Sequence, residues 1–175
     1  HDIWAHTNGD RSASDVQATN VRLFRQVADM TVAAGLKLVF EPHPDTLSMD
    51  NAWCVDFCDA VAEGRPAGSV GILFDTCHYG VGQPSTYLQA IEQLGPRIQH
   101  VHFSDGDCRT YALHLPLGDG CLDLAGATAA LKQIGFRGSL TCDMYNYPLL
   151  EDGARRNVEP IRAVESELGL NRAVG

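Results

Sequence analysis

Val70-Gly71-Ile72-Leu73-Phe74-Asp75-Thr76-Cys77-His78 is an apolar run that stops on a carboxylate, with a histidine three residues further on. A second segment, Ile98-Gln99-His100-Val101-His102-Phe103-Ser104-Asp105, also has a buried-strand pattern that ends at residue types able to bind a metal. Both predict buried strands, and a helical pattern lies between them. Side chains at the C-terminal ends of parallel strands converge on one face of an α/β sheet or barrel. We therefore expect Asp75 and His102 to be neighbours in space.

The same alternation of strand and helix continues along the rest of the chain. Further strands are expected at 36–40 and 139–142, with a weaker one at 3–7. Apolar residues at helical spacing follow the strands, at 16–34, 53–61, 87–94, 124–134 and 158–168. Strands and helices that alternate with short connections predict a parallel sheet with helices packed outside it. A doubly wound sheet would need a glycine-rich phosphate turn after an early strand, and the chain has none.

Composition limits the kind of protein this can be. A length of 175 residues suits one domain, spanning 1–175. The formal charge of −9 argues against a nucleic-acid partner, because phosphate binding needs clustered Lys and Arg. No apolar span is long enough for a membrane helix and no signal peptide is visible, so no membrane partner is expected. The six cysteines form no CxxC pair, and we interpret them as reduced thiols of a cytoplasmic protein.

Four successive strands each end at a residue that can hold a metal ion: Glu41, Asp75, His102 and Asp143. One acidic residue at the end of one strand is more often a helix cap or a solvated loop residue. Four in a row at the same topological position indicate a common site. Three carboxylates and an imidazole suit one divalent ion such as Mn²⁺, Mg²⁺, Co²⁺ or Zn²⁺. The cysteines do not supply the thiolates of a structural zinc site.

These residues also carry a resemblance to a known family. The motifs are Phe40-Glu41-Pro42-His43, Phe74-Asp75-Thr76-Cys77-His78, Val101-His102-Phe103-Ser104-Asp105 and His114-Leu115-Pro116-Leu117-Gly118-Asp119-Gly120. In this order and spacing they resemble the xylose isomerase-like TIM-barrel superfamily, the sugar phosphate isomerase/epimerase group. That group also contains ketose 3-epimerases, hydroxypyruvate isomerase, inosose dehydratase and endonuclease IV. The resemblance runs from about Ala34 to the terminal helix.

The resemblance implies an α/β fold of the (β/α) TIM-barrel type in which only about the C-terminal five strands are present. A whole barrel usually needs ~250 residues, so 1–175 is expected to be a single C-terminal portion of one. A half-barrel would leave apolar strand edges and helix flanks exposed. We therefore expect the missing half to come from the rest of a longer chain, a partner chain or self-association.

The resemblance further implies roles for individual residues. Glu41, Asp75, His102 and Asp143 would hold the metal, and Glu41 and Asp143 would also act as the acid/base pair. A metal that holds a carbonyl and an adjacent hydroxyl stabilises the enediolate formed when the α-proton leaves. Candidate substrate-binding residues are His78, His114 in a closing loop, Asp105 and His43. For these the alternatives stay open: His43 and Asp105 could each cap a turn, and the glycines around His114 could be turn formers.

Two departures from the family pattern affect the expected function. The last ligand is usually Glu, whereas Asp143 is one methylene shorter. The trinuclear repair nuclease has an Asp-x-His pair where this chain reads Ala112-Leu113-His114, which disfavours a nuclease. We expect a metal-dependent isomerase or epimerase acting on a small, unphosphorylated sugar or related ketone. The alternatives are an inosose-type dehydratase and a non-catalytic, degenerate barrel module.

Overall fold

Four parallel strands form the sheet on which the chain is built. The computed structural model describes residues 13–170, and its main sheet has the order β1-β2-β3-β6. The strands are β1 (Leu38–Phe40), β2 (Val70–Asp75), β3 (Ile98–His102) and β6 (Ser139–Thr141). All three pairings are parallel, which confirms the α/β expectation and the four main strands. The weaker strand expected at 3–7 lies outside the described residues.

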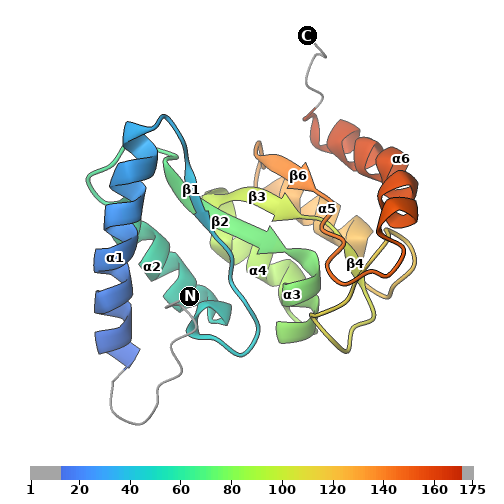
Figure 1. Cartoon of the computed structure of the whole chain (residues 1–175), viewed down its shortest axis with the longest axis horizontal. Coiled ribbons are helices and arrows are strands. Elements are labelled where there is room, and N and C mark those ends of the chain that lie inside the picture. Colours follow the sequence, from blue (N-terminus) through green and yellow to red (C-terminus); the bar gives the residue numbers. More distant parts are fainter. Residues whose placement is uncertain (1–12, 171–175) are drawn as a thin grey trace.

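The helices lie between the strands in sequence and cover the sheet. They are α1 (Ala13–Ala33), α2 (Asn51–Ala62), α3 (Thr76–Gly82), α4 (Tyr87–Leu94), α5 (Leu124–Gln133) and α6 (Leu150–Leu168), with short 3-10 turns η2 (Leu47–Met49) and η3 (Gly95–Arg97). Figure 1 shows α2, α4 and α5 gathered along one side of the sheet, with α1 beyond β1 and α6 beyond β6. Among the described helices, none is long and apolar enough to cross a membrane.

Side-chain packing between the helices and the sheet fixes where each strand ends. Ile72, Phe74 and Val101 on the strands are fully buried, as are Phe57 of α2 and Leu131 of α5. Burying a side chain of this size contributes about 1.5–3 kcal/mol. The strands are anchored by this core, so the residues that follow them project from one end of the sheet.

The segment after β3 is more ordered than its glycine content suggests. It contains a two-stranded antiparallel ribbon of β4 (Asp105–Gly106) and β5 (His114–Leu115). In the register of this ribbon, Asp105 lies opposite Leu115 and Gly106 opposite His114. The ribbon turns the chain back so that His114 approaches the ends of the main strands.

One expectation about the cysteines was wrong. Cys108 and Cys121 form a disulfide with a Cα–Cα distance of 6.2 Å, whereas Cys54, Cys58, Cys77 and Cys142 are free. Spacing could not reveal this pair, because the two residues meet only where the chain folds back after β5. Disulfides persist mainly in oxidising compartments. The expected cytoplasmic location rested on six reduced cysteines, so it stays a prediction.

Candidate metal centre

Three of the four predicted ligands meet at one end of the sheet. Glu41 follows β1, Asp75 ends β2 and His102 ends β3, and one potential ligand atom from each lies within 4.8 Å of the other two. His102 Nδ1 is 3.1 Å from Glu41 Oε1 and 3.3 Å from Asp75 Oδ2. The register of β2 against β3 places Asp75 directly opposite His102, which confirms that they are neighbours.

Asp143 follows β6 and borders this group. Its Oδ2 lies 3.6 Å from His102 Nδ1 and 3.4 Å from His114 Nδ1, and its side chain is 34% exposed. The backbone at this point is tied to the neighbouring strand, because the Ser104 hydroxyl donates to the Asp143 carbonyl over 2.5 Å. Asp143 can therefore reach the centre from the side opposite Glu41, since β1 and β6 are the two edge strands of the sheet.

The two oxygens of the buried Asp75 carboxylate have separate tasks. Oδ1 accepts hydrogen bonds from the backbone N–H groups of Cys77, at 2.7 Å, and His78, at 3.0 Å, and so caps α3. Oδ2 faces the other ligands. Burial raises the pKa of Asp75, but contact with His102 and the nearby His78 and His114 outweigh burial, so the pKa lies below its usual value. The residue therefore stays an anion with one oxygen directed into the centre.

The residues fit a cation, because three buried polar atoms here face one another, and none of them makes a hydrogen bond outside this group. They are Glu41 Oε1, Asp75 Oδ2 and His102 Nδ1. Buried polar atoms are normally hydrogen-bonded, so three that converge with no partner outside their group call for an explanation. Separations of 3.1 and 3.3 Å are those of ligands around one ion at about 2.0–2.2 Å. Oxygen and imidazole donors suit a hard or borderline divalent ion.

The acidity of His102 agrees with a centre built for positive charge. Burial lowers the pKa of the imidazole, but the adjacent Asp75 and Glu41 carboxylates outweigh burial and raise the pKa to about 10. Without a metal, His102 thus carries a proton at neutral pH. A divalent ion bound here would replace this proton as the positive charge beside the carboxylates.

Two more histidines belong to the same place. Asp75, His78 and His114 form a second group of buried residues whose potential ligand atoms lie within 4.8 Å of one another. The His78 and His114 rings are 5.5 Å apart. His114 Nδ1 is 3.1 Å from the Asp143 carbonyl and Nε2 is 3.2 Å from the Tyr111 carbonyl, which fixes the ring orientation. The structure therefore brings both predicted substrate-binding histidines to the centre, with Asp75 shared by the two groups.

His43 and His100 differ in how close they lie to the centre. His43 lies beside the centre, with its ring 4.1 Å from the His78 ring, and burial together with the charge of His78 lowers its pKa. His100 lies one step deeper on β3, is half-buried and pairs with the Ser139 hydroxyl at 2.6 Å, so it is held by the sheet rather than by the centre. The position of His100 follows from strand geometry, because His100 and His102 are alternate residues of β3 and face the same side.

Asp105 is placed differently from the expectation that it binds substrate. It is 2% exposed, and neither metal-ligand group includes it. Its Oδ1 accepts from the N–H groups of Gly106 and Leu122, and its Oδ2 accepts from those of Gly118 and Gly120, at 2.9–3.1 Å. The Asp105 carboxylate thus accepts hydrogen bonds from the loop backbone, and we correct its role to that of a loop anchor.

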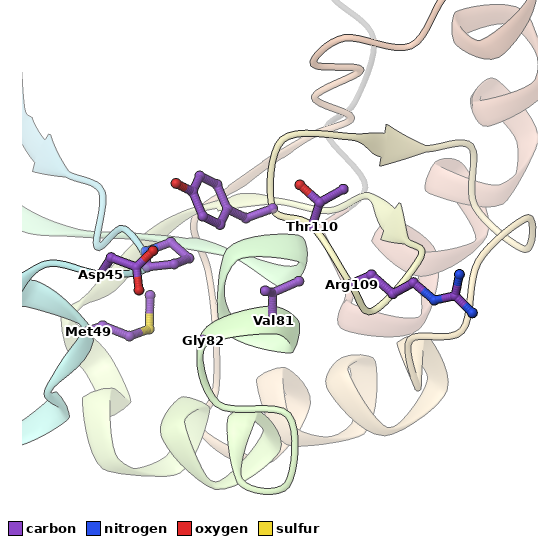
Figure 2. Close-up of a pocket in the computed structure, with 8 residues that line it drawn as sticks. Asp45, Met49, Val81, Gly82, Arg109 and Thr110 are labelled. Atoms are coloured by element: carbon purple, nitrogen blue, oxygen red, sulfur yellow. The ribbon is translucent and has the colours of Figure 1, made fainter.

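Sequence reasoning missed Tyr111. Its ring makes edge contacts with His43 at 4.9 Å and His78 at 5.9 Å, and it also lines a cavity of about 320 Å³. In Figure 2, Asp45 and Met49 lie on one side of this cavity and Thr110 on the other, with Val81 and Gly82 between them, while Arg109 points away from Asp45. Tyr111 stands in a loop without periodicity, so no pattern in the sequence could place it.

Convergent carboxylates and histidines at the ends of parallel strands form a candidate metal site in an α/β protein of the barrel type. The chain belongs to the xylose isomerase-like TIM barrel family, whose profile matches residues 3–164.

Known relatives agree on the fold. An uncharacterised protein of Methanocaldococcus jannaschii is 22% identical over 134 residues, which are 76% of this chain and 45% of the relative. The D-psicose 3-epimerase of Clostridium cellulolyticum H10, solved with D-tagatose, superposes with a TM-score of 0.72 at 18% identity, over 93% of this chain and 60% of that one. The IolI protein, solved with a zinc atom, superposes with a TM-score of 0.70 at 19% identity, over 93% of this chain and 60% of that one. The chain thus spans 45–60% of the length of these proteins.

Proposed function

We propose that this chain carries the metal centre of a divalent-metal-dependent isomerase or epimerase that acts on a small sugar or related ketone. The observation that carries the proposal is the convergence of buried atoms of Glu41, Asp75 and His102 that make no hydrogen bond outside their own group, with Asp143 at the border. A metal bound there supplies a Lewis acid that polarises a substrate carbonyl. The solved epimerase and the zinc-containing IolI structure among the similar folds support this class.

Glu41 and Asp143 are suited to move the substrate proton. They extend from the two edge strands, so they approach His102 Nδ1 from opposite sides, at 3.1 and 3.6 Å. Their side chains are 32% and 34% exposed, which leaves each able to reach a bound molecule. One carboxylate can then remove a proton beside the carbonyl and the other can return it. His78 is placed to orient a substrate oxygen, whereas both ring nitrogens of His114 face backbone carbonyls, so His114 would instead position Asp143 and the loop around Tyr111.

The substrate is proposed to be neutral. Phosphate recognition needs a basic cluster or a long helix N-terminus at the rim. Arg109 is the cation that the sequence places in this loop region, and Figure 2 shows its guanidinium directed outward, away from Asp45 and the other labelled residues of the cavity. A panel of sugars and their phosphates tests this: a preference for a sugar phosphate would refute a neutral substrate.

Apolar surface beside both sheet edges supports completion of the barrel by further strands. On the β1 side Met30 is 72% and Leu36 62% exposed, and on the β6 side Leu149 is 62% and Leu150 59% exposed. Large apolar groups in water usually mark a contact surface. A longer chain, a partner chain or a second copy would cover these residues and complete the wall of the substrate site.

Two measurements test the proposal. Metal analysis after incubation with Mn²⁺ or Co²⁺ should find one ion per chain, and ketose incubated in deuterated water should gain deuterium without losing water. Absence of a bound ion after incubation with either metal would favour the alternative hypothesis of a non-catalytic barrel module. Loss of water from the substrate would instead indicate a dehydratase.

A further inference from the structure

The segment from Asp105 to Leu122, here called the ribbon loop, brings His114 and Tyr111 to the metal centre. Its second half is held to β4 by the Asp105 carboxylate, and the Cys121 N–H donates to the Gly106 carbonyl over 2.9 Å. Its first half, residues 107–113, forms the tip between β4 and β5. The Cys108–Cys121 disulfide joins the tip to the anchored second half.

The tip contacts the centre directly. The Tyr111 carbonyl lies 3.2 Å from His114 Nε2, and the Tyr111 ring contacts the rings of His43 and His78. Cys108, the second residue of the tip, has a φ of 57°, a left-handed conformation that residues other than glycine rarely adopt. The covalent bond therefore holds a backbone that prefers another conformation, and with it the position of Tyr111 and the orientation of His114.

The disulfide is open to solvent, because Cys108 and Cys121 are both exposed. The four free cysteines differ, since Cys54, Cys58 and Cys77 are buried and Cys142 is half-buried. Thiolates attack accessible disulfides, and exposed disulfides are more often the labile ones. Burial also raises the pKa of the Cys77 thiol to about 12, which makes this nearest free cysteine a poor internal nucleophile.

We propose that Cys108–Cys121 is a thiol–disulfide exchange site for low-molecular-weight thiols, and that its redox state sets the order of the ribbon-loop tip at the metal centre. The thiolate of one glutathione attacks a cysteine sulfur, the S–S bond breaks, and the other cysteine leaves as a thiolate. A second glutathione resolves the mixed disulfide. Two cysteine thiols and one glutathione disulfide result, so the protein is reduced by two electrons and the glutathione is oxidised by two. This site goes beyond the proposed function and does not depend on catalysis.

The test uses the unmodified protein in defined mixtures of reduced and oxidised glutathione. Maleimide labelling with mass spectrometry should show Cys108 and Cys121 protected in the oxidised mixture and labelled together in the reduced one. Hydrogen exchange in peptides covering 107–113 should become about tenfold or more faster on reduction, while peptides of α5 should not change. Neither measurement requires metal, so failure of metal binding would reject the proposed function without affecting this result.

Matched variants separate the disulfide from general effects of the reductant. The double variant C108S/C121S should show fast exchange at 107–113 in both mixtures, and C142S should respond as the unmodified protein does. A pair that stays oxidised in fully reduced glutathione is a structural crosslink and would overturn the proposal. Reduction without faster exchange at 107–113 would also overturn it, because the bond would then not order the tip.

Discussion

Asp75 Oδ2 lies 3.3 Å from His102 Nδ1 across the parallel pair β2 and β3, in which the two residues are register partners. In the metal-free protein the two form an ion pair, since the pKa of His102 is raised to about 10 and that of Asp75 is lowered. The proton on His102 therefore occupies the nitrogen that a metal would need. Proton and metal compete for one atom.

Metal affinity should consequently rise with pH. His102 is protonated in the metal-free state below about pH 10, so binding must release that proton. Each unit of pH between 6 and 9 should then strengthen apparent affinity by about tenfold. Titrations with Co²⁺ at several pH values, with proton release measured by calorimetry in buffers of different ionisation enthalpy, check this. Affinity that is constant over this range, without proton release, would contradict it.

His102 and His100 form a matched pair for mutation, because they lie on the same strand with rings 5.3 Å apart. His102→Ala should weaken metal binding by about a hundredfold or more, since it removes a ligand. His100→Ala removes the contact with Ser139 and should lower stability by about 1 kcal/mol while keeping the metal. Metal analysis and thermal unfolding of both variants distinguish them. Equal metal loss with equal melting temperatures would contradict the assignment.

Substitutions of Asp143 should show whether its short side chain limits proton transfer. Misplacement by about an ångström can cost roughly a hundredfold in rate. Asp143→Glu should keep the metal and retain or raise turnover. Asp143→Asn should lose proton exchange on one face of the substrate and bind metal more weakly, because the carboxylate near His102 and His114 is gone. Unchanged metal content and turnover in Asp143→Asn would place Asp143 outside the site.

Asp105 and Asp107 are two carboxylates in one loop that both accept backbone N–H groups. Asp105→Asn should lower the free energy of unfolding by about 2–3 kcal/mol, because the amide would turn a donor toward buried N–H groups. Asp107→Asn should cost much less than Asp105→Asn, since its partners, the N–H groups of Arg109 and Thr110, lie near solvent and the amide oxygen can still accept. Urea unfolding measures both. Equal losses would mean that Asp105 is not the loop anchor.

The sequence by itself determined the strands and the residues that end them. The apolar run at 70–74 and the segment 98–103, in which Ile98, Val101 and Phe103 are apolar, both predict strands inside the fold, so Asp75 and His102 were expected at the same edge. Glu41 was placed by the same reasoning. These positions depend on periodicity and chain order, which are local properties that a sequence contains in full.

Only the tertiary structure decided how the loops meet that edge. The Cys108–Cys121 bond, the four backbone donors on Asp105 and the contacts of Tyr111 with His43 and His78 join residues that follow no repeat. Such contacts depend on how far the chain folds back between β4 and β5. Loop direction is set by hydrogen bonds and packing formed across the fold. The sequence alone therefore could not tell whether the Asp105 carboxylate faces substrate or the loop backbone.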